Sequence, residues 1–185
     1  MASPSTSDRA DAFGLLGLSP RFDVEPAQLE RAFFERSKEL HPDRFATAPA
    51  SERVVALSKS RALNDAYQLL KREVSRAEYM LGREGLTIGD NERIDPALVM
   101  ELLEEREVLS EARLRGELRE VERLQASMRG RRRGALDRVK ALFREVETAT
   151  GDARLAALTA IKGQLILLRY VERYLAECDA ALDED

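Results

Sequence analysis

The chain has 185 residues, of which 44% are hydrophobic and 35% charged, and its formal net charge is −4. This composition allows a packed core, but it argues against a general nucleic-acid binder, which usually carries a basic surplus. A single histidine and a single cysteine, Cys178, exclude an intramolecular disulfide and cannot supply the usual zinc ligands, so we expect neither metal nor cofactor. No apolar run is long enough to span a membrane, and Met1–Asp8 lacks the features of a secretory signal. We therefore expect a cytoplasmic protein with no membrane contact.

The first part of the chain predicts short helices after a disordered tail, which covers residues 1–9. A short helix over 10–18 is ended by Ser19-Pro20, and a longer one over 25–40 has to stop before Pro42. A polar connector, 41–50, follows.

Helical periodicity resumes after the connector. Ser51 is a good N-cap for a helix that runs to about Lys71, and a short helix over 75–81 ends at Gly82. The expected inner face of the longer helix consists of Val54, Leu57, Leu63, Tyr67 and Leu70.

The second part of the chain begins after a Gly- and Asn-containing stretch. We place one domain over 10–84, a linker at 85–95 and a second domain over 96–185. Leu/Glu/Arg-rich segments to about Arg115, over 117–148 and over 152–182 have short connections, which indicate an antiparallel three-helix bundle. The predicted fold is all-α, in two parts.

One tripeptide is the main functional motif of the sequence. His41-Pro42-Asp43 lies on the connector between two amphipathic helices. The preceding helix is basic near its end, at Arg36 and Lys38, and Arg44-Phe45 follows at once. Three residues alone are weak evidence, because a histidine before a proline is usually a solvated loop residue, but this context strengthens the motif.

These residues resemble the J-domain family, and within it the HscB branch. Four further segments in the right order carry the resemblance, which extends over about residues 12–180: Phe13-Gly14-Leu15-Leu16-Gly17-Leu18, Arg76-Ala77-Glu78-Tyr79-Met80-Leu81, Met100 with Leu103-Glu104 and Arg106-Glu107, and Leu168-Arg169-Tyr170-Val171. The fold it implies is an N-terminal J-domain, an antiparallel hairpin with a His-Pro-Asp loop, followed by the three-helix bundle.

The resemblance implies a regulator and no catalysis by the chain itself. Members stimulate the ATPase of a DnaK/HscA-class chaperone through the turn and the basic residues around it. The implied chaperone-binding residues are His41, Pro42, Asp43, Arg36, Lys38 and Arg44. The residue types suit the task, since Pro42 stiffens the turn and the Asp43 carboxylate can accept a bidentate arginine.

A second surface is expected on the helix that follows Pro96. At about 100° per residue, residues 98–112 form two apolar stripes, where a surface helix needs only one. Leu98, Leu102, Val108, Leu109 and Ala112 form the expected core stripe. Val99, Met100 and Leu103 form the second stripe, which is flanked by the acidic residues Glu104, Glu107 and Glu111. The resemblance implies that it binds an iron–sulfur scaffold protein of the IscU type, together with an aromatic on the last helix; the scaffold-binding residues are Val99, Met100, Leu103, Glu104, Glu107, Glu111 and Tyr170.

Several alternatives stay open at this stage. In the alternative to a partner site, the second stripe packs against the J-domain or a third helix, and Tyr170 belongs to the hydrophobic core. Arg129–Gly134 is a basic stretch without interleaved aromatics, which favours a solvated part of a long helix, or a break in it, over a nucleic-acid site. The rival functions are a general J-domain co-chaperone for other clients and a structural helical adaptor. Enzymatic activity is not expected, because the sequence contains neither a Gly-rich phosphate-binding loop nor a second histidine.

Overall fold

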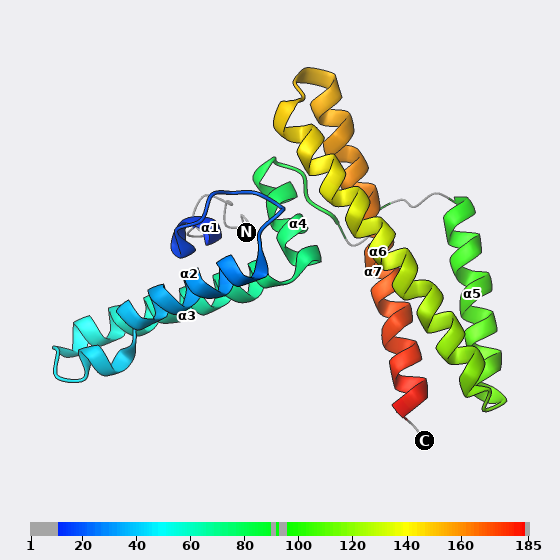
Figure 1. The fold of residues 1–185 in the computed structure, drawn as a ribbon, viewed down its shortest axis with the longest axis horizontal. Helices are drawn as coiled ribbons and strands as arrows, with labels where there is room; N and C mark the ends of the chain where they lie inside the picture. Colours follow the sequence, from blue (N-terminus) through cyan, green and yellow to red (C-terminus); the bar gives the residue numbers. More distant parts are fainter. Residues whose placement is uncertain (1–10, 90–91, 93–95, 184–185) are drawn as a thin grey trace, which may run out of the picture. The chain divides into compact units, whose positions relative to one another are not determined.

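The structure, a computed structural model, describes residues 11–89, 92 and 96–183. The chain divides into two compact units, with the division between Gly85 and Leu86 (Figure 1). All regular secondary structure in these described ranges is helical. The all-α prediction is therefore confirmed, whereas the expected tail at 1–9 and positions 90–91 and 93–95 of the expected linker lie outside the described residues.

The first unit is built around a helical hairpin. α1 (Ala12–Leu16) is followed by α2 (Pro26–Glu39), which has a proline in its first turn, where no backbone donor is lost. α3 (Ala50–Lys71) runs back along α2, and α4 (Glu73–Arg83) completes the unit. Gly17 ends α1 in the left-handed conformation, with φ +68°, which is accessible to glycine without steric cost.

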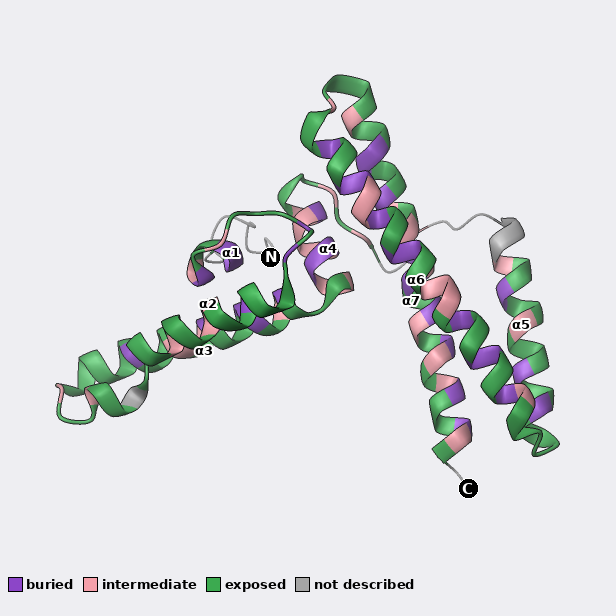
Figure 2. Cartoon of the chain, in the orientation of Figure 1, coloured by how far each residue is buried: buried purple, intermediate pink, exposed green. Residues whose placement is uncertain are grey.

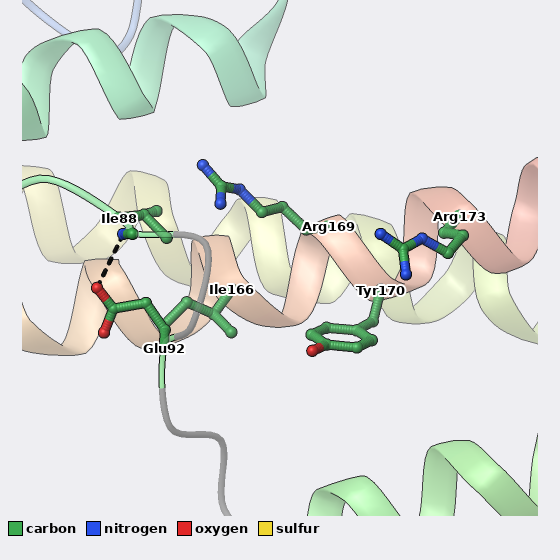
Figure 3. A pocket seen from close by; sticks show the side chains of 7 residues that line it. Ile88, Glu92, Ile166, Arg169, Tyr170 and Arg173 are labelled. Atoms are coloured by element: carbon green, nitrogen blue, oxygen red, sulfur yellow. Dashed lines mark hydrogen bonds between the residues drawn. The ribbon is translucent and has the colours of Figure 1, made fainter.

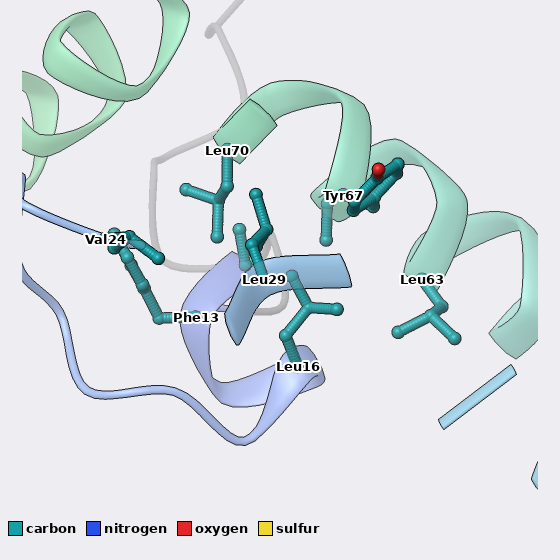
Figure 4. Close-up of a cluster of buried hydrophobic side chains, with 9 residues drawn as sticks. Phe13, Leu16, Val24, Leu29, Leu63, Tyr67 and Leu70 are labelled. Carbon is teal, nitrogen blue, oxygen red and sulfur yellow. The ribbon is translucent and has the colours of Figure 1, made fainter. Parts of the chain in front are cut away.

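The hydrophobic core of this unit lies where α1, α2 and α3 meet. Phe33 of α2 stacks on Tyr67 of α3, with ring centroids 4.3 Å apart. The buried side chains are those of Ala12, Phe13, Leu16, Val24, Leu29, Leu63, Ala66, Tyr67 and Leu70 (Figure 4). This cluster holds the hairpin together on the side away from its tip.

The structure corrects two predictions for α3. The helix begins at Ala50, and Pro49 occupies the N-cap position that we had predicted for Ser51. Val54 and Leu57 were predicted to face the core, but their side chains are 67% and 55% exposed. Ala56 is the buried residue in this stretch, and at about 100° per residue Val54 lies on the opposite side of the helix from it.

The second unit is a three-helix bundle. α5 (Pro96–Leu114) and two longer helices, α6 (Leu118–Thr148) and α7 (Gly151–Asp183), pack with α6 antiparallel to the other two (Figure 1). Figure 2 shows that α6 and α7 alternate buried and exposed residues along their length. The buried side chains that join all three helices include Leu109, Ala112, Val121, Met128, Val171, Tyr174 and Cys178.

The basic stretch Arg129–Arg133 lies inside α6, which continues through it without a break. Arg131 pairs with Glu101 at 2.8 Å and with Glu105 at 3.1 Å, both on α5. Arg132 pairs with Glu172 of α7 at 3.3 Å. Two of the arginines thus connect α6 to its neighbours. Within the described part of the chain, no helix has the length and apolar character needed to cross a membrane.

Candidate partner-binding sites

The His-Pro-Asp turn lies at the tip of the α2–α3 hairpin. α2 ends at Glu39, and residues Pro42–Phe45 form a single 3₁₀ turn for which His41 is the N-cap. His41 Nδ1 accepts a hydrogen bond from the Asp43 backbone N–H at 3.3 Å, and it lies 3.5 Å from Asp43 Oδ2. Both side chains are largely exposed. The turn is therefore held in one shape by its own residues while its polar groups still face solvent.

Two of the predicted basic residues, Lys38 and Arg44, lie beside the same turn, whereas the Arg36 guanidinium lies next to Gly17 at the end of α1. Arg44 Nη1 donates to the Lys38 carbonyl at 3.4 Å, which satisfies one of the open carbonyls at the end of α2. Lys38 Nζ lies 4.3 Å from the centroid of the Phe34 ring. Arg36 pairs with Glu39 at 3.3 Å. The hairpin tip thus carries basic side chains, and of the predicted basic residues Arg36 already pairs with an acidic residue of the same helix, Glu39.

On α5, the two predicted apolar stripes have different exposure. Leu102, Leu109 and Ala112 are buried as predicted. Val108 is 45% exposed, so its assignment to the core stripe was wrong; it lies 100° around the helix from Leu109, beyond the part that α6 and α7 cover. The side chain of Leu98 lies outside the described residues.

The second stripe faces solvent at its two longest apolar residues. Met100 is 58% and Leu103 is 55% exposed, while Val99 is half-buried. The three carboxylates of the predicted rim, Glu104, Glu107 and Glu111, are all exposed. Neither Met100 nor Leu103 is part of a core, so both are available for contact with another molecule.

Polar contacts set the register of α5 against α7. Arg106 of α5 pairs with Glu177 of α7 at 2.8 Å, and the Tyr174 hydroxyl donates to the Glu105 carbonyl at 3.0 Å. α5 and α7 run in the same direction, so residues two turns before the ion pair lie at the same level on the two helices. These residues are Val99 on α5 and Tyr170 on α7. Tyr170, which is exposed, thus lies on the α7 edge that faces the apolar stripe of α5.

The same contacts perturb two ionisable groups. Burial raises the pKa of the Glu105 carboxyl, against the opposing effect of Arg131. Burial also raises the pKa of the Tyr174 hydroxyl, which therefore stays protonated and able to donate to α5.

A cavity of about 290 Å³ lies beside Tyr170 (Figure 3), and the sequence reasoning did not find it. Its lining residues are Ile88, Gly89, Glu92, Ile166, Arg169, Tyr170 and Arg173. Glu92 accepts from the Gly89 N–H at 2.9 Å and pairs with Lys162 at 2.7 Å. These two bonds lower the pKa of the Glu92 carboxyl. The only sequence signal was the spacing of Arg169 and Arg173, four residues apart on one helix.

A hairpin with His-Pro-Asp at its tip, followed by a helical bundle, is the arrangement that the sequence analysis expected from its resemblance to J-domain proteins. Residues 94–179 match the family described as the HSCB C-terminal oligomerisation domain. The chaperone HscB of Vibrio cholerae superposes with a TM-score of 0.79 at 26% identity, over 95% of this chain and 99% of that one. Human co-chaperone protein HscB gives a TM-score of 0.80 at 22% identity, over 96% and 84% of the two chains.

Curated relatives point to the same family. The co-chaperone protein HscB homolog of Vibrio vulnificus (strain YJ016) is 46% identical over 101 residues, or 54% of this chain. Its counterpart in Bordetella pertussis is 41% identical over 105 residues, or 56% of this chain. The matches span 59% and 62% of the lengths of these relatives. The chain is thus similar to HscB co-chaperones in sequence over about half of its length and in fold over nearly all of it.

Proposed function

We propose that this protein stimulates the ATPase of a DnaK/HscA-class chaperone and delivers an iron–sulfur scaffold protein of the IscU type to it. The observation that carries the proposal is the exposed His-Pro-Asp turn at the tip of a hairpin, in a chain that matches HscB structures over nearly its whole length. The protein acts as a regulator of its partner and works in the cytoplasm, a compartment that suits its one buried thiol.

The geometry of the turn suits docking to an ATPase. The hydrogen bond from the Asp43 N–H to His41 Nδ1 restricts the turn before binding, so less conformational entropy is lost on contact. The exposed Asp43 carboxylate can accept two hydrogen bonds from one arginine of the partner. Lys38 and Arg44 attract an acidic surface and steer the encounter.

Delivery needs a second surface that can be occupied at the same time. Met100, Leu103 and Tyr170 belong to the second unit, whereas the His-Pro-Asp turn belongs to the first. The residues proposed to hold the scaffold therefore include none of those proposed to contact the chaperone. Joining the two contacts in one chain raises the effective concentration of scaffold at the chaperone.

Steady-state ATP hydrolysis by the host's DnaK-class chaperone tests both parts of the proposal. We expect this protein to stimulate hydrolysis, and added scaffold to raise the rate further. His41→Gln should abolish stimulation without a change in helicity, because the residue is exposed and contributes to no core. Gln68→Ala, an exposed change on α3, serves as the matched control.

Each result has a definite meaning. A His41→Gln variant that stimulates as well as the wild type would rule out the turn as the chaperone contact. Stimulation that scaffold leaves unchanged would indicate a general J-domain protein with another client. An absence of stimulation by any such chaperone of the host would favour a structural helical adaptor.

A further inference from the structure

The tip of the α2–α3 hairpin has a cavity beside the His-Pro-Asp turn. Its volume is about 290 Å³, and its lining comes from the end of α2, the 3₁₀ turn and the first three turns of α3. In the chain, Leu40 of this lining immediately precedes His41, and Phe45 follows Asp43 by two positions. A partner that contacts the turn therefore has this cavity next to it.

Apolar side chains form most of the described lining of this cavity. They are those of Leu40, Phe45, Val55 and Ala56. Ala56 is buried, Leu40 and Phe45 are half-buried, and the Val55 side chain is 52% exposed. Removing apolar surface from water is favourable by about 25 cal/mol for each Å² that is covered. The cavity is therefore suited to an apolar group of another molecule, which would cover Val55 and its neighbours.

The polar residues of the lining are all exposed, which places them at the rim. They are Ser51, Glu52 and Lys59. Glu52 and Lys59 are seven residues apart on α3, so their positions differ by about 10 Å along the helix axis and the rim has opposite charges at its two ends. An apolar centre with a polar rim is typical of a protein–protein contact, whereas a small-molecule site has polar groups that converge on the ligand. The occupant is therefore a protein side chain.

We propose that this cavity receives an apolar side chain of the chaperone ATPase, in a segment with a basic group near Glu52 and an acidic group near Lys59. The inference rests on the proposed function, because it adds to the turn a second contact with the same partner. Continuity with the turn favours the chaperone over the scaffold, whose proposed contacts belong to the second unit. A second copy of this chain would cover residues on both sides of the turn, so it would compete with the chaperone.

The test measures ATP hydrolysis by the host's DnaK-class chaperone against the concentration of the full-length protein. Val55→Ser should raise the concentration for half-maximal stimulation about fivefold, because the cavity loses apolar surface, and should leave the maximal rate unchanged. Val54→Ser is the matched control: Val54 is the preceding residue, is 67% exposed and is not part of the lining. It should change the half-maximal concentration less than about twofold. Circular dichroism and thermal midpoints establish that both variants are folded.

Two further variants test the cavity without removing its apolar lining. Ser51→Tyr covers it from an exposed position and should also raise the half-maximal concentration, so this variant decides the matter if Val55→Ser unfolds the hairpin tip. Glu52→Lys/Lys59→Glu reverses the order of the rim charges and leaves the net charge unchanged. It should raise the half-maximal concentration about threefold at low salt, and the difference should shrink at high salt.

His41→Gln separates the inference from the function on which it rests. If this change abolishes stimulation while folded Val55→Ser behaves like Val54→Ser, the cavity inference is wrong and the proposed function stands. If the wild-type protein does not stimulate the chaperone, the proposed function fails, and the inference fails with it. Calorimetric titration should give the same scaffold affinity for Val55→Ser and the wild type. Weaker scaffold binding, or a wild-type dimer in sedimentation that Val55→Ser dissociates, would assign the cavity to another occupant and overturn the proposal.

Discussion

Tyr79 connects the two ends of the first unit through its hydroxyl. The hydroxyl accepts a hydrogen bond from the Ala12 N–H at 2.9 Å and donates one to Asp11 Oδ1 at 3.0 Å. Asp11 also pairs with Arg83, one turn further along α4. The start of α1 is thus held to α4 by contacts between residues almost seventy positions apart.

Tyr79→Phe should lower the free energy of unfolding by about 1–3 kcal/mol, because the partly buried Ala12 N–H then loses its acceptor. Tyr170→Phe removes the same hydroxyl from an exposed ring and should leave stability unchanged. Urea unfolding of the two variants measures the difference. Equal midpoints for the two variants would show that the Tyr79 bonds contribute nothing.

Cys178 is fully buried between the helices of the second unit, and burial raises the pKa of its thiol to about 11. The thiolate is the reactive form, so at pH 8 very little of it is present in the folded protein. We expect iodoacetamide to modify Cys178 only at the rate at which the bundle opens, and rapidly in denaturant. Mass spectrometry over a time course checks this; fast modification of the folded protein would contradict the burial.

At the scale of the element, α5 has apolar side chains both on its buried side and on its exposed side. Leu102 is buried against the bundle, whereas Leu103, the next residue, faces solvent. Consecutive residues lie about 100° apart, so one helix can present apolar side chains to its own core and to a second molecule. Glu101 and Glu105 pair with α6 and Arg106 pairs with α7, so these three residues reach the neighbouring helices from α5.

We expect Met100→Ala/Leu103→Ala to weaken scaffold binding and to leave the thermal midpoint nearly unchanged, since both side chains are more than half exposed. Leu102→Ala is the matched control on the same helix. It should cost about 2–5 kcal/mol of stability because it opens a space in the core. Calorimetric titration and thermal unfolding together separate the two effects. A large loss of stability in the double variant would place Met100 or Leu103 in the core.

At the scale of the whole molecule, two buried hydrophobic clusters among the described residues have no member in common. One lies among α1, α2 and α3, and the other lies among α5, α6 and α7. Each unit therefore has its own source of hydrophobic stabilisation, proportional to the apolar area that it buries.

Hydrogen exchange should reveal this division. Leu70→Ala should reduce amide protection in α1, α2 and α3, and Ile161→Ala should do so in α6 and α7, because both side chains are completely buried and each belongs to a different unit. We expect each variant to leave protection in the other unit at the wild-type level. Equal loss throughout the chain for either variant would mean that the two units unfold as one.

The sequence by itself determined the all-α class, the approximate bounds of the helices and the position of the exposed turn. Proline restricts the backbone of its own and the preceding residue, and helical periodicity is visible within a few turns, so these features depend on near neighbours in the chain. The resemblance to HscB also came from short motifs, His41-Pro42-Asp43 among them.

Only the tertiary structure decided which apolar residues are covered. Val54, Leu57 and Val108 have the same apolar character as buried residues nearby, yet 67%, 55% and 45% of their respective surfaces are exposed in the described part of the chain. The cavity beside Tyr170 joins Glu92 to Arg169 and Arg173, which are about eighty positions away in the chain. Burial and charge pairing depend on segments far apart in the sequence, and periodicity within one helix carries no information about them.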